Sequence, residues 1–284
     1  MSDWLQALLL GVIEGITEFL PISSTGHLLI AERWLGARSD LFNISIQAGA
    51  ILAVVAIYRT RLWQLLRAFV GAPAQVPPVV ANDAAGSGQS PRDYAYKLLL
   101  AFGVTAVLGV AVKLAGFELP TRIAPVAWAL IIGGGWMLLA ESFAAHRALR
   151  LGERTAITWV VALLVGVAQV AAGVFPGTSR SGAAIFVALI AGTTQRAAAT
   201  EFVFLVGIPT MFAATGFELV DVLREGGVGA EDWGLLAIAF VASALTAFVA
   251  VKWLLRYIQT HRFTAFAIYR ILLGGALLWW LARA

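Results

Sequence analysis

The chain of 284 residues contains no cysteine and little charge. Without cysteine it can form neither disulfides nor thiolate metal sites. Charged side chains make up 13% of the sequence and apolar ones 60%, whereas a soluble domain has about 25% charged residues. So few polar groups cannot cover a globular surface in water. The composition therefore excludes an ordinary soluble domain and indicates that lipid surrounds much of the protein.

Six apolar segments are long enough to cross a bilayer, which takes about 20 helical residues. Two further apolar regions, 3–36 and 157–193, are interrupted by "PISSTGH" and "FPGTSRSG". Each half of these regions is too short to cross, so we interpret both as re-entrant helix pairs. Non-helical backbone at that depth must be buried in protein or line a wet cavity. The expected spans are 41–59, 95–116, 123–145, 200–221, 233–256 and 263–282.

The two interrupted regions resemble each other when Pro21 is aligned with Pro176. The match indicates a duplicated unit of one re-entrant pair and three spans. Because three is odd, the second copy enters from the opposite face, which gives an inverted repeat. The predicted fold is an all-α integral membrane protein with six transmembrane helices and two re-entrant pairs in an inverted-topology repeat. The other matched positions are Gly11 with Gly166, Glu14 with Gln169, Ser23 with Thr178, and Ser24 with Ser179.

We expect one membrane domain over 1–284, with repeat one at about 1–150 and repeat two at about 155–284. The tract 71–92 is rich in Ala, Pro, Gly and Ser, which is typical of a flexible loop. Lys and Arg are more numerous on the face opposite the termini. The positive-inside rule then places this loop in the cytoplasm, and both termini and the opening of the first re-entrant pair on the outer face.

The first interruption, "EGITEFLPISSTGH", begins with two carboxylates in an apolar setting. Glu14 and Glu18 are four residues apart and therefore share one helix face. Each costs about 2.5–3.5 kcal/mol near a bilayer centre. A divalent cation, a nearby arginine or protonation of one carboxyl must offset that cost. A water-exposed helix end is the alternative interpretation.

Hydroxyls and an imidazole follow these carboxylates: Ser23, Ser24, Thr25 and His27. Serine and threonine are favoured residues at a helix N-cap, which accounts for one of them. Capping alone does not explain three hydroxyls together with a histidine. A helix N-terminus also binds anions through its free N–H groups and its dipole.

The second interruption, "FPGTSRSG", places Arg180 at the tip of a turn that begins at Pro176. A membrane-embedded arginine among glycines and hydroxyls indicates a phosphate or carboxylate clamp. An ion pair with Glu14 or Glu18 is the alternative, and the two interpretations are compatible. The candidate substrate contacts in this turn are Gly177, Thr178, Ser179, Ser181 and Gly182.

Two other features have structural interpretations. Arg270, inside "AFAIYRILL", is expected to be a structural partner or to extend toward the interface. The "GGG" at 133–135 is expected to permit close helix packing.

At the two interruptions the sequence closely resembles the undecaprenyl-diphosphate phosphatases, the bacitracin-resistance membrane family. That family carries the motifs E-G-x-T-E-F-L-P-x-S-S-T-G-H and P-G-x-S-R-S-G. Further likeness in "IQAGAILAVV", "EFVFLVGIPTM" and "FAIYR" extends the resemblance over nearly the whole chain.

The resemblance implies hydrolysis of undecaprenyl diphosphate at the outer, periplasmic face of the bacterial inner membrane. This reaction recycles the lipid carrier of peptidoglycan synthesis and confers bacitracin resistance. The resemblance also implies a divalent cation, Mg²⁺ or Ca²⁺, and a homodimer. The expected partners are the polyprenyl diphosphate substrate and membrane lipid. No nucleic-acid partner is expected. The functional residues carried over by the resemblance are Glu14, Glu18, Ser23, Ser24, His27 and Arg180.

The reaction has several possible routes. We favour Ser24 as nucleophile with His27 as its base, while Glu14 and Glu18 hold the cation and Arg180 grips the diphosphate. Direct attack by His27, or by water activated by Glu18 or His27, is the alternative. Secondary transporters and lipid flippases form the competing class, because they too combine inverted repeats with broken helices. Transport, however, does not require a nucleophile beside a base.

Overall fold

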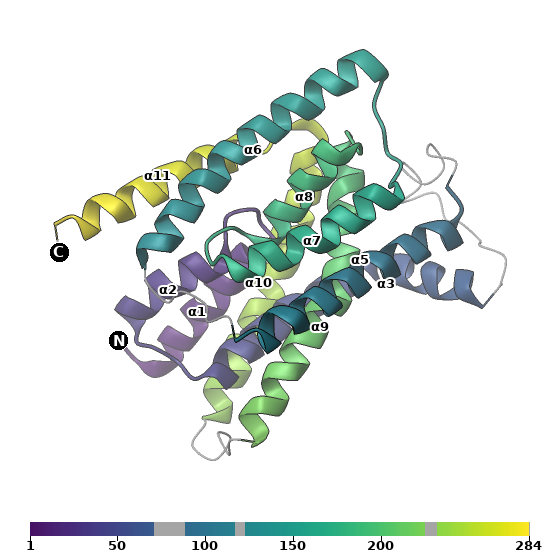
Figure 1. Cartoon of the computed structure of the whole chain (residues 1–284). Coiled ribbons are helices and arrows are strands. Elements are labelled where there is room, and N and C mark those ends of the chain that lie inside the picture. The colour runs from purple at the N-terminus through teal and green to yellow at the C-terminus, as the bar shows by residue number, and fades with distance from the viewer. Residues whose placement is uncertain (71–88, 117–122, 225–231, 284) are drawn as a thin grey trace.

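The computed structural model in Figure 1 describes residues 1–70, 89–116, 123–224 and 232–283. Most of the predicted loop at 71–92 lies outside the described residues. Its last two residues, Pro91 and Arg92, differ from the prediction because they begin a helix. Ser90 caps that helix by accepting a hydrogen bond from the N–H of Asp93, and proline is well suited to a first helical position.

Six helices of the described chain are long and apolar enough to cross a membrane, which confirms the predicted all-helical membrane fold. The six are α3 (Asp40–Phe69), α5 (Pro91–Leu114), α6 (Ile123–Leu151), α9 (Arg196–Arg224), α10 (Trp233–Thr260) and α11 (Thr264–Leu281). Helices α3, α6, α9 and α10 extend beyond the predicted apolar runs, because polar and charged residues at the ends of these runs remain helical. Helix α11 lies within its predicted run, and α5 begins four residues before its run and ends two residues before the end of that run.

Four shorter helices form two pairs, each interrupted where the sequence predicts. The first pair is α1 (Asp3–Thr17) with α2 (Ser24–Leu35), and the second is α7 (Trp159–Val174) with α8 (Arg180–Ala191). The longest, α7, has 16 residues and is about 24 Å long, which is less than the roughly 30 Å of a hydrocarbon core. The two helices of each pair pack against each other.

The turns between these helices share one backbone device, but not in the predicted register. Ser23 and Ser179 have φ angles of 74° and 71°, and no other described residue except glycine has a positive φ. Each is an N-cap whose hydroxyl accepts a hydrogen bond from the N–H three residues later. Ser179 therefore corresponds to Ser23 and not to Ser24. The second turn has one more residue between its proline and its cap serine, so Arg180 corresponds to Ser24.

Glycines bring the short helices close to two of the spans. A Cβ added at Gly11 of α1 would lie 2.3 Å from the carbonyl oxygen of Ala239 in α10, and one added at Gly166 of α7 would lie 2.6 Å from that of Ala101 in α5. Small residues permit such close packing of helices in a membrane. Gly11 and Gly166 are matched positions, so these contacts support the internal repeat. Its inverted topology and its boundaries near 150 and 155 remain predictions.

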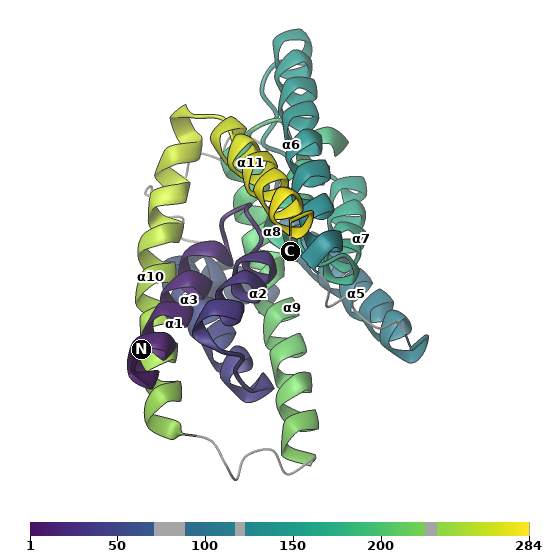
Figure 2. The same cartoon turned by 90° about the vertical axis from the view of Figure 1, so that its left-hand side faces the viewer.

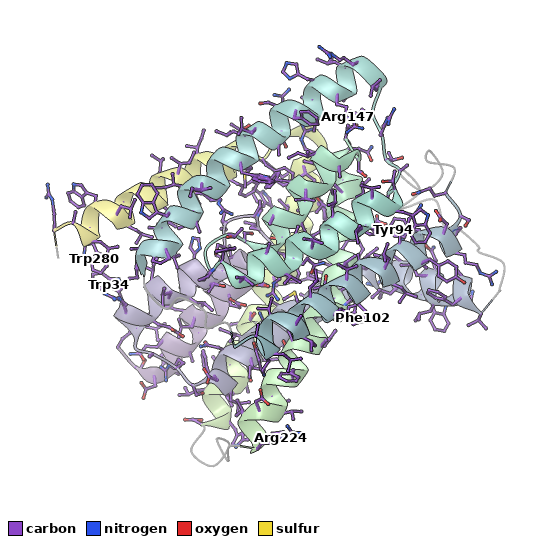
Figure 3. All side chains as sticks on the ribbon, viewed as in Figure 1. Trp34, Tyr94, Phe102, Arg147, Arg224 and Trp280 are labelled. Carbon is purple, nitrogen blue, oxygen red and sulfur yellow. The ribbon has the colours of Figure 1, made fainter. Side chains whose placement is uncertain are left out.

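The remaining long helices enclose this arrangement. Helices α6 and α11 run side by side, and α3 lies between α10 and α9 (Figures 1 and 2). Large apolar side chains such as Leu139, Leu245 and Leu272 are exposed on the outer surfaces, as expected for helices in contact with lipid. Trp34 and Trp280 lie near each other at one end of the molecule, and Arg147 lies at the other (Figure 3).

Candidate active site

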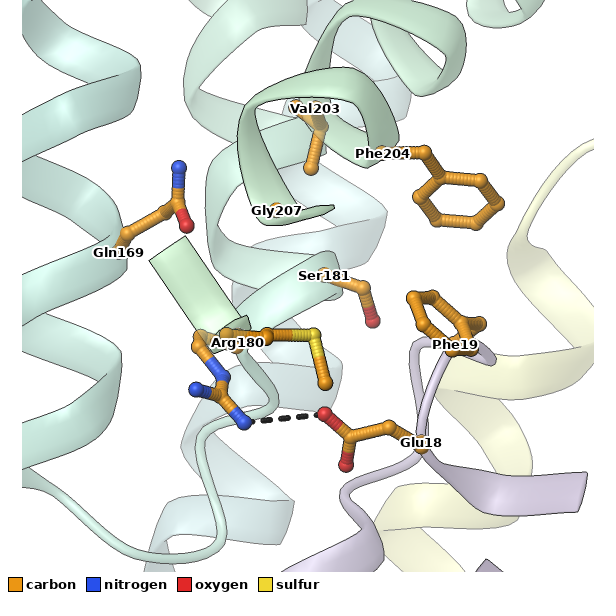
Figure 4. Close-up of a pocket in the computed structure, with 9 residues that line it drawn as sticks. Glu18, Phe19, Gln169, Arg180, Ser181, Val203, Phe204 and Gly207 are labelled. Atoms are coloured by element: carbon orange, nitrogen blue, oxygen red, sulfur yellow. Dashed lines mark hydrogen bonds and ion pairs between the residues drawn. The ribbon is translucent and has the colours of Figure 1, made fainter. Parts of the chain in front are cut away.

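The two turns meet through an ion pair. Arg180 Nη2 donates to Glu18 Oε1 at 3.0 Å, joining the second turn to the first (Figure 4). The Glu18 side chain is buried, and that of Arg180 is 28% exposed. The guanidinium thus offsets the cost of burying this carboxylate. Of the three ways to offset the buried carboxylates, the structure shows the arginine for Glu18.

Ser24 lies on the other side of the same carboxylate. Its hydroxyl donates a hydrogen bond to Glu18 Oε2. Ser24 is the first residue of α2 and is buried. One carboxylate therefore holds a hydroxyl and a guanidinium together, each drawn from a different half of the chain.

Neither ring nitrogen of His27 is hydrogen-bonded to Ser24, which differs from the expected pairing of nucleophile and base. Its Nδ1 lies 2.7 Å from the carbonyl oxygen of Ser23, and its Nε2 lies 2.6 Å from the hydroxyl of Tyr269 in α11. The two rings are stacked with centroids 5.7 Å apart. Helical side chains lean toward the N-terminus of their helix, which directs His27 back onto the residue four positions before it. Glu18 takes the position beside Ser24 that the sequence suggested for His27.

Three of the other predicted hydroxyls, those of Ser23, Ser179 and Ser181, have structural partners. Ser23 and Ser179 cap α2 and α8, with distances of 3.3 and 3.2 Å to the capped nitrogens of Gly26 and Gly182. Ser181 Oγ lies 3.2 Å from Ser179 Oγ and donates to the carbonyl of Leu20 at 3.3 Å, which links the second turn to the first.

Arg270 of α11 donates hydrogen bonds to the backbone of both turns. Its guanidinium is buried, and each of its five N–H groups donates to a carbonyl oxygen. Arginine has five donors, so the set is complete. None of the ion pairs among the described residues includes Arg270, which confirms it as a structural partner of the backbone. The acceptors are Pro21 (3.2 Å) in the first turn, Gly177 (3.0 Å) and Thr178 (2.9 Å) in the second, and Ala129 (3.1 Å) and Leu130 (3.4 Å) in α6.

The first residue of each of the helices α2 and α8 reaches the same carboxylate, because Ser24 begins α2, Arg180 begins α8 and both bind Glu18. The N-termini of these helices carry the positive ends of their dipoles. Such a combination of helix N-termini and guanidinium groups is suited to an anion with several oxygens.

Two cavities adjoin the cluster of Ser24, Glu18 and Arg180. A small pocket is lined by Glu18 and Arg180 together with Gln169, Phe19 and Phe204 (Figure 4). A larger cleft is lined by Glu14, Ser24 and Thr25, among others. The hydrogen bond between Ser24 and Glu18 therefore lies between the two cavities.

Glu14 provides an unsatisfied oxygen beside this site. It is 2% exposed, and its Oε2 has no hydrogen-bond partner among the described residues. A buried carboxylate oxygen without a partner is costly. Carboxylate oxygens are the ligands that Mg²⁺ and Ca²⁺ prefer, so the free oxygen of Glu14 fits the expected cation, whereas both oxygens of Glu18 already bind Ser24 and Arg180. Within the described residues, no three acidic or histidine side chains are grouped closely enough to hold a metal by themselves.

Tyr269 and the backbone contacts of Arg270 were not predicted. Tyr269 stands in an apolar stretch with no spacing that marks it, and its partner His27 is 242 residues away. The only signal was the family-like string "FAIYR", which gives no contact.

Six candidate spans and a hydroxyl–carboxylate–guanidinium cluster where two turns meet are typical of a membrane protein that acts on a phosphorylated group. The family described as bacitracin resistance protein BacA matches residues 7–276. The chain belongs to this family.

Relatives support that assignment over the full length. The chain is 58% identical over 285 residues to the undecaprenyl-diphosphatase of Xanthomonas campestris pv. campestris (strain 8004), covering 100% of both chains. It is 60% identical over 276 residues to the undecaprenyl-diphosphatase of Rhizobium etli (strain CIAT 652), covering 97% of this chain and 96% of the relative.

Proposed function

We propose that this protein is an undecaprenyl-diphosphatase, which hydrolyses undecaprenyl diphosphate to undecaprenyl phosphate and inorganic phosphate. It is a multi-pass protein of the bacterial inner membrane. Full-length relatives at 58% and 60% identity support this activity. The contact of Glu18 with both Ser24 and Arg180 carries the proposal, because it places a nucleophile, a proton acceptor and an anion-binding cation in one cluster.

Binding of the diphosphate is assigned to Arg180 and to the N-termini of α2 and α8, which are the positive ends of the helix dipoles. Phosphoryl transfer depends mainly on positioning and on neutralising charge. Arg180 is partly exposed beside Glu18, so it can turn toward the terminal phosphate. The N-termini of α2 and α8 face the same group, and Arg270 keeps both in place through its backbone contacts.

The chemical step begins at Ser24. Its oxygen attacks the terminal phosphorus in line, forming an O–P bond, while its proton passes to the hydrogen-bonded Glu18. The P–O bond to the bridging oxygen breaks, and undecaprenyl phosphate leaves with that electron pair. Water then displaces Ser24 from phosphorus, and Glu18 returns the proton to the Ser24 oxygen. The oxygen and both hydrogens of the water stay with the phosphorus, and the inorganic phosphate leaves as H₂PO₄⁻.

His27 has a positioning role in this proposal. Its contacts with the Ser23 carbonyl and with Tyr269 fix the start of α2, where Ser24 stands. Attack by His27, which would give a phosphohistidine, and attack by water remain the alternative routes.

Glu14 and Glu18 would hold the divalent cation. The unsatisfied Oε2 of Glu14 supports this assignment. When bound, the cation neutralises charge on the diphosphate and on the departing phosphate. The residues of this chain orient the nucleophile and accept its proton.

The proposal also includes the orientation of the protein in the membrane and the biological role of the reaction. The excess of Lys and Arg on the opposite face supports periplasmic termini and an outward-opening site. Hydrolysis there would recycle the lipid carrier and confer bacitracin resistance by removing the drug's lipid target. The homodimer remains a prediction from the family resemblance.

The direct test is phosphate release by the purified protein in detergent, with undecaprenyl diphosphate as substrate. We expect release of inorganic phosphate and accumulation of undecaprenyl phosphate. An Arg180→Ala preparation provides the control for a contaminating phosphatase. If the lipid diphosphate stays intact, the enzyme proposal fails and a transporter becomes the better interpretation.

A further inference from the structure

The large cleft is acidic well beyond the proposed active site. Four carboxylates line it in addition to Glu14, and no lysine or arginine is among its described lining residues. We call this part the acidic vestibule. It consists of Glu32 in α2, Asp40 at the start of α3, and Glu218 and Asp221 near the end of α9.

Neighbouring residues neutralise only a small part of the negative charge of these four carboxylates. Lys113 pairs with Asp221 at 2.8 Å, and Asn43 donates to Glu32 at 3.2 Å. None of the ion pairs among the described residues includes Asp40 or Glu218, and both residues are exposed. The vestibule therefore carries a net negative charge.

Such a vestibule conflicts with direct entry of an anionic substrate. A cleft lined by charge of one sign repels like charges and raises the local concentration of counterions. A divalent cation is attracted twice as strongly as a monovalent one at the same potential. The vestibule is thus suited to divalent cations, and a bare diphosphate would be repelled from it.

A second observation points to the same ligand. The unpartnered Oε2 of the buried Glu14 belongs to the lining of this cleft. Protein hydrogen bonds do not explain that oxygen, whereas a cation arriving through the cleft would satisfy it. Glu14 and the vestibule residues lie on different helices, so the two observations are independent.

We infer that the acidic vestibule collects hydrated Mg²⁺ or Ca²⁺ and supplies it to Glu14, so that the diphosphate meets a cation already in place. This inference rests on the proposed function. No three acidic side chains of the described residues are close enough to coordinate one ion. The vestibule carboxylates therefore hold the cation through its water shell, which Mg²⁺ in particular gives up reluctantly. Binding there is weak and sensitive to salt.

The test neutralises the two unpaired carboxylates by Asp40→Asn and Glu218→Gln, singly and together. Glu153→Gln, which neutralises an exposed residue just after α6, is the matched control. Binding of Mn²⁺ is measured by electron paramagnetic resonance in detergent without lipid substrate. Phosphate release is then followed against Mg²⁺ or Ca²⁺ concentration at low and high salt.

We expect the double variant to lose weak Mn²⁺ sites and to need about tenfold more cation for half-maximal hydrolysis at low salt. Its deficit should lie in that half-saturating concentration rather than in the maximal rate. Added monovalent salt should remove the difference from wild type by screening. Each single variant should show part of the effect, and Glu153→Gln should show none.

Unchanged Mn²⁺ binding and unchanged cation dependence in the double variant would overturn the inference. So would faster hydrolysis at low cation concentration, which would mean that the vestibule only repels substrate. The Mn²⁺ measurement needs no turnover. If wild type releases no phosphate but the double variant binds less Mn²⁺ than wild type, the proposed function fails while the cation-collecting role of the vestibule stands.

Discussion

The guanidinium of Arg270 occupies the space that a side chain at Gly133 would need. A Cβ added at Gly133 would lie 2.1 Å from Arg270 Nη2. The predicted close packing at "GGG" is therefore found, and the absence of a side chain at Gly133 leaves room for the guanidinium. From this position Arg270 donates to the carbonyls of Pro21 and Thr178, one in each turn.

Gly133→Ala should consequently disturb the active site from a distance. The added methyl group must displace the guanidinium, and each buried donor left unsatisfied costs about 1–3 kcal/mol. Displaced turns should also slow hydrolysis by about 100-fold, because small misplacements of reacting groups are expensive. Thermal unfolding in detergent and phosphate release measure the two effects.

The same glycine triplet supplies the control. A Cβ at Gly135 would have no neighbour within 4 Å, and alanine favours a helix over glycine by about 1 kcal/mol. Gly135→Ala should therefore be at least as stable and as active as wild type. Equal behaviour of the two variants would contradict the role assigned to Arg270.

Arg180→Ala should abolish most hydrolysis while the protein stays folded. Removing one preorganised donor to a developing anion typically costs about 100- to 1000-fold in rate, and Arg180 also orients Glu18. The matched control is Arg61→Gln, which breaks the 2.9 Å ion pair with Glu201 away from the proposed site. That variant should lose stability more than activity. Wild-type turnover by folded Arg180→Ala would refute the clamp.

Rapid quenching with substrate labelled in its terminal phosphate should trap label on Ser24. The Ser24 hydroxyl already donates to Glu18, so Glu18→Gln should slow the appearance of label. The adduct should survive acid, as phosphoserine does, and be absent in Ser24→Ala. An acid-labile adduct on His27 would replace Ser24 as the nucleophile, and turnover without any adduct would favour direct attack by water.

Substitutions at Ser179 should show an unusual order of stability. Its φ of 71° costs a residue with a Cβ about 1–2 kcal/mol, whereas glycine adopts it freely. Both Ser179→Gly and Ser179→Ala lose the hydroxyl that accepts from Gly182 N–H. Ser179→Gly should therefore be more stable than Ser179→Ala by roughly 1 kcal/mol in the free energy of unfolding, and it should unfold at a higher temperature. The reverse order would show that the turn relaxes to another backbone conformation.

The membrane architecture was predictable because its signal is simple. Each span needs a long apolar run, and each turn is marked by proline, glycine and hydroxyl residues. The ends of the spans were less predictable. Helix α3 continues to Phe69 through Arg61 and Arg67, because an apolar run marks the part of a helix in hydrocarbon and not the helix itself.

The charges of the site were also predictable, since Glu18 and Arg180 would each be costly alone in apolar surroundings. The register of the turns was not. Whether Ser23 or Ser24 caps α2 depends on a single backbone angle, and one extra residue in the second turn shifts the correspondence. The contacts of Arg270 were hidden for another reason: its acceptors are backbone carbonyls, which every residue possesses.

The position of Arg270 along the chain imposes an order on assembly. The turns that it holds are complete after residues 24 and 180, yet their common donor belongs to α11, which leaves the ribosome after both of them. A nascent chain can insert its earlier helices, but the two turns gain their shared anchor only once α11 has been made. A chain arrested before α11 is therefore expected to be inert in lipid hydrolysis.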